Sequence, residues 1–117
     1  MGFKIEEYSF GRMAVDGTTF SKDLIVLPVG KVLSPWWRAS GHRLTLDDLG
    51  PVVEARPEIL VIGTGAYGIM KPEPGLTESL AELGIQTRIF KTKKAVAEYN
   101  ALHTGGKKIA ACFHLTC

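Results

Sequence analysis

The chain has 117 residues, of which 45% are hydrophobic and 22% are charged, the balance of one ordinary globular domain. Its net charge of +2 is too small to favour a nucleic-acid partner, and no apolar run approaches the roughly 18 residues of a membrane span. The chain has two cysteines and no signal-peptide pattern, so we expect neither a disulfide scaffold nor membrane insertion. We therefore predict one soluble cytoplasmic domain that covers residues 1–117.

The first third of the chain has the pattern of β-hairpins. Asp16 and Gly17 separate two short segments of strand-like residues, and Asp-Gly is a strong signal for a two-residue hairpin turn. A second predicted hairpin joins the apolar residues 24–27 to residues 31–33. Further along, Thr45 is expected to begin a short helix, because its hydroxyl can cap and acidic residues follow it.

From residue 59 onward, the pattern alternates between strands and helices. Strands are predicted at residues 59–62, 86–90 and 109–115, and helices are predicted to begin near Leu76 and Thr92. This alternation favours parallel strands joined by right-handed crossovers, and the hairpins add antiparallel partners. The predicted fold class is therefore α/β, a compact three-layer α/β/α domain with a mixed β-sheet and N-terminal β-hairpins.

A glycine-rich turn follows the buried strand at residues 59–62. Residues 63–68 read Gly-Thr-Gly-Ala-Tyr-Gly and match the dinucleotide-binding pattern, but prolines at positions 72 and 74 delay the helix that such a site needs. We therefore predict no cofactor. Two interpretations remain open: the turn only lets the chain reverse tightly, or backbone amides hold a small anion. The amides of the second interpretation belong to Gly63, Thr64 and Gly65.

A second candidate for anion binding is the start of the predicted helix at Thr92. Lys93 and Lys94 lie where a helix favours acidic side chains, because its N-terminus carries partial positive charge. A bound anion, or an acidic patch on a partner, would compensate for this arrangement. The alternative is that these lysines are simply solvated. If the preceding strands are parallel, Thr92 and the glycine turn share one edge of the sheet.

The C-terminal segment carries a cysteine and a histidine on one predicted strand face. The period of two places Cys112, His114 and Thr116 on that face. A Cys–His pair can produce a thiolate nucleophile, but neighbours on one strand diverge and no third, orienting group is evident. We favour a packing role, with His114 partly buried and both its nitrogens hydrogen-bonded. The cysteine spacing predicts neither a zinc site nor a disulfide between Cys112 and Cys117.

Two adjacent tryptophans in the segment at residues 34–38 are candidates for a binding surface. Trp36, Trp37 and Arg38 belong to residue types that are favoured as anchors in protein interfaces. In an extended segment the two rings cannot both point inward, so one would be exposed. The alternative is that the loop folds back and both rings cover the core.

Several segments together resemble a known family. They are Leu60–Gly65, Gly84-Ile85, Thr92-x-x-Ala95-Val96-x-Glu98-Tyr99-Asn100-x-Leu102 and Phe113-His114-x-Thr116-Cys117. On these segments the chain resembles the family of the domain of unknown function four-nine-eight, which includes a mitochondrial respiratory complex I assembly factor and an adipogenesis-associated cytosolic protein. The resemblance covers nearly the whole chain and is tightest from residue 59. It implies a three-layer α/β fold with a mixed sheet, no established enzymatic activity and a role in helping other proteins assemble.

These observations predict two alternative functions. The first is a non-enzymatic protein-interaction or assembly-factor-type module that binds another protein. The second is a small-anion or ligand-binding protein, which could be an enzyme, that uses the glycine turn at residues 63–68 and the lysine-bearing helix start at residues 91–94. Neither interpretation assigns a catalytic residue or a metal.

Overall fold

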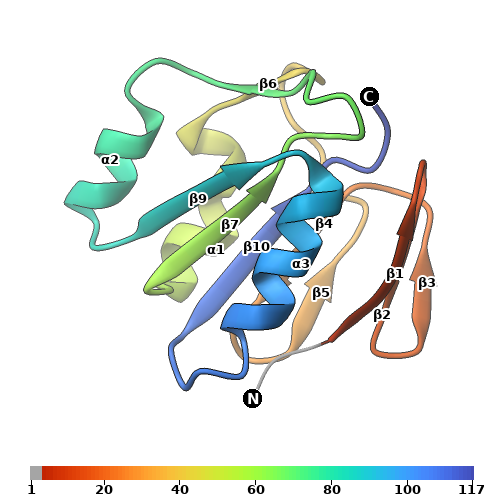
Figure 1. Cartoon of the computed structure of the whole chain (residues 1–117). Coiled ribbons are helices and arrows are strands. Elements are labelled where there is room, and N and C mark those ends of the chain that lie inside the picture. Colours follow the sequence, from red (N-terminus) through yellow and green to blue (C-terminus); the bar gives the residue numbers. More distant parts are fainter. Residues whose placement is uncertain (1–3) are drawn as a thin grey trace.

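The main sheet of the protein contains five strands in the order β5-β4-β10-β7-β9 (Figure 1). This computed structural model describes residues 4–117. Strand β10 pairs in parallel with β7, β7 pairs in parallel with β9, and β4 and β5 join as antiparallel strands. The mixed sheet expected from the sequence is therefore confirmed. The strands are β4 (Leu24–Leu27), β5 (Lys31–Leu33), β7 (Ile59–Gly63), β9 (Gln86–Phe90) and β10 (Ile109–Phe113).

A separate three-stranded antiparallel sheet lies beside the main sheet. It consists of β1 (Ile5–Ser9), β2 (Arg12–Val15) and β3 (Thr18–Phe20). The predicted hairpin turn is confirmed, with φ of 50° at Asp16 and 88° at Gly17. The sequence pattern predicted that this hairpin would add strands to the main sheet. That prediction is wrong, because the hairpin belongs to the separate sheet. Only β4 and β5 supply the antiparallel strands of the main sheet, because the β1–β3 sheet packs over one face instead.

Two very short strands form a third sheet that the sequence did not predict. Strand β6 (Arg43–Leu44) pairs in parallel with β8 (Lys71–Pro72). Each strand has only two residues, which is too few to show the alternation of apolar and polar residues that identifies a strand in a sequence. This pairing joins the chain that follows residue 42 to the chain that follows the glycine turn.

The helices cover both faces of the main sheet. They are a 3₁₀ helix at Leu46–Leu49, α1 (Gly50–Ala55), α2 (Leu76–Glu82) and α3 (Thr92–Leu102). Figure 1 shows α3 on one side of the sheet, and α1 and α2 on the other. Every residue of β7 and of β10 is buried, as expected for parallel strands that are covered on both faces.

The core consists of two clusters, one on each face of the main sheet. Alternate residues of β7 divide between them: Ile59 and Val61 pack toward α3 and the β1–β3 sheet, while Leu60 and Ile62 pack toward α1 and α2. This division follows from the period of two along a strand. The three-layer α/β fold is thus confirmed, with the β1–β3 sheet sharing one outer layer with α3.

The sequence predicts that the Thr92 hydroxyl caps the helix that begins there, and this prediction is wrong. Lys91 occupies the cap position of α3, whereas Thr92 is the first helical residue and is fully buried. The Thr92 hydroxyl accepts a hydrogen bond from the backbone N–H of Gly65 at 2.8 Å and donates one to the carbonyl of His114 at 2.7 Å. The backbone of Gly65, just after β7, and of His114, just after β10, therefore replaces the expected cap within α3.

Candidate functional site

The glycine turn, residues 63–68, holds the last four residues of the chain, 114–117, which we call the tail. The backbone N–H of Ala66 donates to the Thr116 carbonyl at 2.6 Å. The N–H groups of Tyr67 and Ile69 both donate to the Cys117 carbonyl, at 3.2 and 3.0 Å. The turn and the residue after it therefore provide a set of backbone donors, and the tail of the same chain accepts from them.

The donors that the sequence analysis assigned to an anion also have partners within the protein. The Thr64 N–H donates to the Phe90 carbonyl at 2.9 Å, and the Gly65 N–H donates to Thr92. A Cβ atom at Gly65, where φ is +107°, would collide with the Cys117 backbone and with the ring of His114. Glycine is required at position 65 because the tail packs directly against it. The amides of Thr64 and Gly65 are therefore not available to a ligand in this structure.

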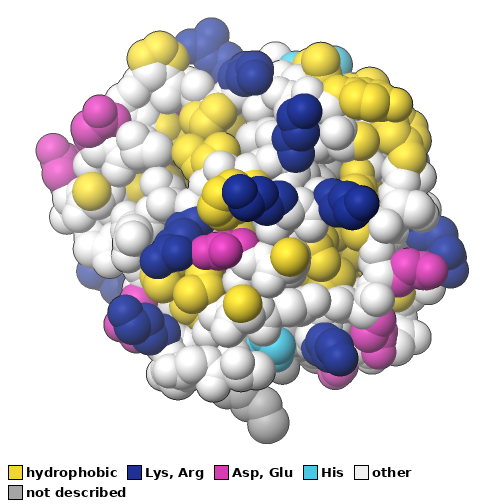
Figure 2. Space-filling model, in the orientation of Figure 1, with side chains coloured by type: hydrophobic (Ala, Val, Ile, Leu, Met, Phe, Trp, Pro, Cys, Tyr) yellow, Lys and Arg dark blue, Asp and Glu magenta, His cyan; other side chains and the backbone are white. Residues whose placement is uncertain are grey.

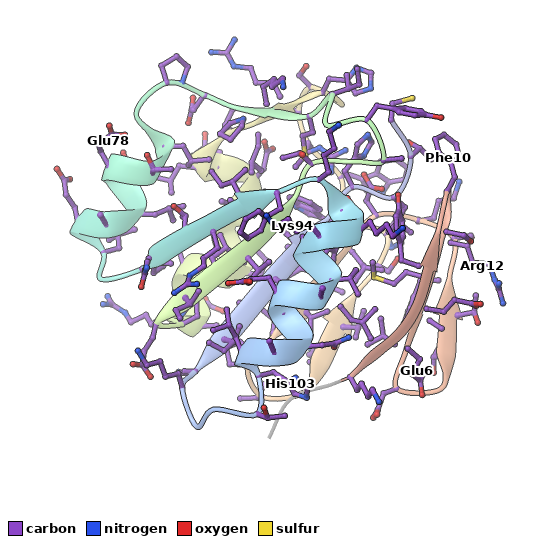
Figure 3. All side chains as sticks on the ribbon, viewed as in Figure 1. Glu6, Phe10, Arg12, Glu78, Lys94 and His103 are labelled. Atoms are coloured by element: carbon purple, nitrogen blue, oxygen red, sulfur yellow. The ribbon has the colours of Figure 1, made fainter. Side chains whose placement is uncertain are left out.

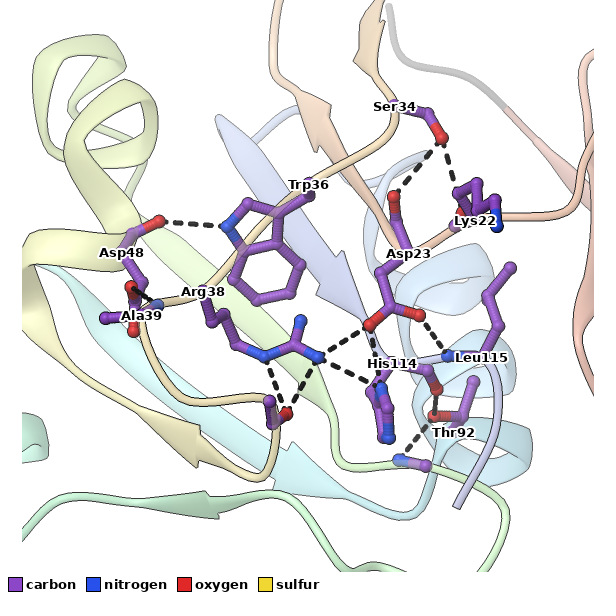
Figure 4. A network of polar contacts seen from close by, with 12 residues as sticks. Lys22, Asp23, Ser34, Trp36, Arg38, Ala39, Asp48, Thr92, His114 and Leu115 are labelled. Atoms are coloured by element: carbon purple, nitrogen blue, oxygen red, sulfur yellow. Dashed lines mark hydrogen bonds and ion pairs between the residues drawn. The ribbon is translucent and has the colours of Figure 1, made fainter.

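A polar cluster of Asp23, Arg38 and His114 lies on the other side of the tail (Figure 4). Asp23 Oδ2 is 2.7 Å from Arg38 Nη2 and 2.7 Å from His114 Nδ1. Asp23 Oδ1 accepts a hydrogen bond from the backbone N–H of Leu115 at 2.8 Å. One carboxylate thus joins the start of β4, the loop at residues 34–42 and the tail.

The hydrogen bonds determine the charge state of Asp23 and the tautomer of His114. We assign a proton to His114 Nδ1, because the nearest acceptor is the Asp23 carboxylate at 2.7 Å. Burial by itself raises the pKa of Asp23, but hydrogen bonds from His114, Leu115 and Arg38 outweigh it and hold this pKa below its ordinary value. Asp23 is therefore ionised at neutral pH and balances the charge of Arg38.

The cluster is buried but not fully hydrogen-bonded. The side chains of Arg38 and His114 are 5% and 7% exposed. Arg38 Nη1 and His114 Nε2 nevertheless lack a hydrogen-bond partner within the described chain. Buried polar atoms without partners are rare in folded proteins and each requires an explanation. The prediction that both nitrogens of His114 are hydrogen-bonded is therefore correct for Nδ1 and wrong for Nε2.

The tryptophan loop, residues 34–42, presents one ring to the core and the other to solvent. Trp36 is 7% exposed and its Nε1 donates to the Asp48 carbonyl at 2.9 Å, whereas Trp37 is 73% exposed. The Arg38 guanidinium lies 4.7 Å from the centre of the Trp36 ring and also donates to the Gly41 carbonyl. Of the three residues predicted to contact a partner, only Trp37 is thus exposed, while Trp36 and Arg38 hold the loop in place.

A pocket of about 250 Å³ lies beside the polar cluster, and we call it the tryptophan pocket. The tryptophan loop provides much of its lining, and the remainder comes from the segment before β4 and from the tail. The residues that line it are Ser21, Lys22, Asp23, Pro35, Trp36, Trp37, Arg38, Gly41 and Thr116.

The Asp23–His114 pair has part of a catalytic arrangement. An aspartate that binds Nδ1 orients the imidazole so that Nε2 can act as a base, so the expectation that no orienting group exists was wrong. However, Nε2 has no hydroxyl or thiol partner among residues 4–117. Burial also raises the pKa of the Cys112 thiol, which therefore stays protonated and unreactive. Asp23 thus orients the His114 ring, and Cys112 does not act as a thiolate beside it.

The lysines at the start of α3 lie apart from this cluster. Lys93 and Lys94 are both exposed, and Lys94 Nζ lies 5.0 Å from the centre of the Phe90 ring. Figure 3 places Lys94 at the beginning of α3, beside β9. The fold therefore brings Thr92 to the glycine turn, as predicted, but leaves the two lysines on the surface. Whether they bind an anion stays a prediction.

Two important features of the site had no signal in the sequence. Asp23 follows a lysine at the start of a strand, and nothing in its local pattern indicates that it meets Arg38 and His114. Phe10 and Tyr67 are 55% and 68% exposed, with ring centres 6.2 Å apart, although 57 residues separate them. Figure 2 shows a hydrophobic region at the upper right, where Figure 3 places Phe10.

Two further observations describe what the structure does not contain. None of the helices within residues 4–117 is long and apolar enough to cross a membrane. Across the same residues, histidine, cysteine, aspartate and glutamate side chains do not gather in groups of three or more that could hold a metal ion.

Solved structures with the same fold come from several organisms. The protein MT938 superimposes with a TM-score of 0.84 at 22% identity, covering 98% of this chain and 99% of its own. A conserved hypothetical protein from Pyrococcus horikoshii gives a TM-score of 0.82 at 27% identity, covering 97% and 99%. A Bordetella pertussis protein described as a Mth938-like domain gives 0.71 at 19% identity, covering 97% and 85%. These similarities show that the fold is that of Mth938-like domains.

The family comparison covers almost the whole chain. The description of proteins of unknown function designated DUF498/DUF598 matches residues 5–114. The match includes the glycine turn, the tryptophan loop and all three residues of the polar cluster. The resemblance noted in the sequence is therefore confirmed: this chain belongs to the DUF498/DUF598 family.

Proposed function

We propose that this domain is a non-enzymatic protein-interaction module of the assembly-factor type, and that it binds another protein through the surface around Trp37. The observation that carries the proposal is the exposure of Trp37, at 73%, on a loop that its buried neighbours hold in place. Tryptophan is among the residue types most enriched at the energetic centres of interfaces.

The fixed position of the loop supports this role. Trp36 is anchored by its hydrogen bond to the Asp48 carbonyl, and Arg38 is anchored by Asp23 and by the Gly41 carbonyl. Trp37 lies between these two anchored residues. A partner that covers its ring would therefore lose little free energy in ordering the loop backbone, which favours affinity.

The exposed pair of Phe10 and Tyr67 also lies beside the tail and extends the candidate surface. The N–H of Gly11, next to Phe10, donates to the Leu115 carbonyl at 2.8 Å, and the N–H of Tyr67 donates to the Cys117 carbonyl. Both aromatic residues are thus attached to segments that the tail holds together. Exposed aromatic groups beside the tail suit a partner that lies across it.

The proposal includes a cytoplasmic location, which the two free thiols support. Cys112 and Cys117 are both unpaired in the structure, as is usual for proteins of a reducing compartment. The alternative function, anion binding at residues 91–94, retains exposed lysines but lacks the amides of Thr64 and Gly65. We therefore place it second.

The proposal can be tested by quantitative affinity purification from cells, comparing the wild-type domain with two variants. Trp37→Ala removes the exposed ring, and Val29→Ala removes a side chain that is 80% exposed in the turn between β4 and β5. We expect specific partners to be enriched with wild type and Val29→Ala, and to be reduced about tenfold with Trp37→Ala, as for the loss of an interface anchor. Equal enrichment by all three proteins would contradict the proposed surface.

A further inference from the structure

The tryptophan pocket combines aromatic walls with a buried hydrogen-bond donor that has no partner. Arg38 uses Nε and Nη2 for the Gly41 carbonyl and Asp23, while Nη1 donates to nothing in the described chain. In Figure 4, Nη1 points toward the edge of the Trp36 ring, and Trp36 lines the pocket together with Asp23. We propose that this pocket binds a small organic carboxylate, whose oxygen accepts the hydrogen bond from Arg38 Nη1.

The charges of the pocket favour an anion. Its lining contains the cations Lys22 and Arg38 and the single anion Asp23. Both oxygens of Asp23 are already occupied, Oδ2 by Arg38 and His114 and Oδ1 by the Leu115 N–H. The group beside the pocket that still lacks a partner is therefore a hydrogen-bond donor, Arg38 Nη1. A carboxylate is the group that a guanidinium binds best.

The walls and the size of the pocket restrict the rest of the ligand. Pro35, Trp36 and Trp37 supply apolar surface, which suits a flat or aliphatic body attached to the carboxylate. The volume of about 250 Å³ lies below the usual range for ligand pockets, which begins near 300 Å³. A free acid of about ten non-hydrogen atoms fits these limits, whereas a nucleotide is too large.

Access to Nη1 depends on the exposed side of the pocket. Nη1 is covered from solvent in this ligand-free structure. The ring of Trp37 lines the same pocket and is 73% exposed, so few contacts hold it in one position. The proposed binding therefore requires the exposed Trp37 ring to move so that a carboxylate reaches the guanidinium. The inference does not depend on the proposed partner protein, because it requires only the purified domain.

The test uses benzoate as the probe and benzamide as its uncharged equivalent. Each is titrated into the isotopically labelled domain at constant ionic strength, and the indole N–H signals of Trp36 and Trp37 are followed by NMR. We expect benzoate to shift these signals saturably, with a Kd on the order of 1 mM, and benzamide to bind at least fivefold more weakly. Equal shifts with both compounds, or no shift with benzoate, would overturn the proposal.

Two variants identify the groups that hold the carboxylate. Arg38→Lys keeps the charge beside Asp23 but removes Nη1, and should weaken benzoate binding at least fivefold. Lys22→Gln changes an exposed side chain, so it should fold normally and weaken binding two- to threefold. If Arg38→Lys does not fold, the test depends on Lys22→Gln. An unchanged affinity of that variant for benzoate would overturn the proposed site.

A third probe separates a free acid from an acidic side chain of a protein. N-acetyl-glutamate N-methylamide carries the same carboxylate on a peptide-like body without an aromatic or aliphatic ring. We expect it to bind more weakly than benzoate, because it makes less contact with the tryptophan rings. Tighter binding of this probe than of benzoate would overturn the assignment to a small organic acid.

Discussion

Two charged groups lie near the carboxyl edge of the main sheet, and they differ in almost every physical property. Asp23, Arg38 and His114 are largely buried, joined by contacts of 2.7 Å, and come from three distant parts of the chain. Lys93 and Lys94 are adjacent in sequence and exposed to solvent. The first group determines how segments of the fold meet, whereas the second can be changed with little effect on the fold.

The difference shows what burial contributes to a charged site. Buried charges lose hydration and remain only where hydrogen bonds replace it, so removing one member leaves the others uncompensated. Exposed charges interact weakly because water and salt screen them. We therefore expect large effects from substitutions around the buried cluster and small effects at the lysines.

The largest contrast is expected between the two adjacent tryptophans beside the cluster. Trp36→Ala should destabilise the domain by about 4 kcal/mol, because it removes a buried ring and leaves a cavity. Trp37→Ala should change the free energy of unfolding by less than about 0.5 kcal/mol, because the ring is 73% exposed. Denaturant unfolding measures both. Similar values for the two variants would show that the assignment of inner and outer rings is wrong.

The second prediction concerns the carboxylate that joins the cluster. Asp23→Ala should cost about 3 kcal/mol of stability, because it leaves the buried Arg38 charge without its counter-ion. Asp47→Ala is the matched control, since Asp47 is an exposed aspartate and should cost less than about 0.5 kcal/mol. A loss at Asp23 no larger than that at Asp47 would argue against a cluster that holds these segments together.

The third prediction is a dependence of stability on acidic pH. The pKa of Asp23 is lower in the folded protein than its ordinary value, so ionised Asp23 stabilises the fold above the unfolded-state pKa of about 4. This stabilisation is lost as the pH falls through the folded-state pKa. The stability difference between wild type and Asp23→Asn should therefore narrow below pH 4. A constant difference from pH 7 to the most acidic pH measured would contradict this linkage.

The smallest effect is expected at the lysines. Replacing Lys93 and Lys94 with glutamate should stabilise the domain by a few tenths of a kcal/mol in chloride, because acidic groups suit a helix N-terminus. If the lysines bind an anion, phosphate should raise the Tm of wild type more than chloride does, and the double variant should lose this gain. Identical responses of both proteins to phosphate would end the anion hypothesis.

The sequence was sufficient to predict most of the fold. The Asp16-Gly17 turn and the apolar strand at residues 59–62 gave local signals, because turn chemistry and strand periodicity depend on neighbouring residues. The sequence did not predict that the first hairpin leaves the main sheet. That outcome depends on packing against α3, which no local pattern describes.

The candidate site was less predictable, because its contacts join distant residues. Thr92 and the glycine turn were expected to share an edge, and they do. Asp23 was not recognised, since its partners lie 15 and 91 residues away in the chain. The hydroxyl of Thr92 was assigned to its own helix because capping is a local rule, whereas in the fold it bonds to the backbone of Gly65 in the glycine turn and of His114 in the tail.

The most direct test of this account is a double-mutant cycle between Asp23 and Arg38, measured as the free energy of unfolding of Asp23→Asn, Arg38→Gln and the double variant. The exposed ion pair of Arg12 and Glu7, whose atoms lie 3.1 Å apart, serves as the control cycle. We expect a coupling of at least about 1 kcal/mol for the buried pair and less than about 0.5 kcal/mol for the exposed pair. Additive effects at Asp23 and Arg38, or equal coupling in both cycles, would contradict the claim that this cluster holds the tryptophan loop to the rest of the fold.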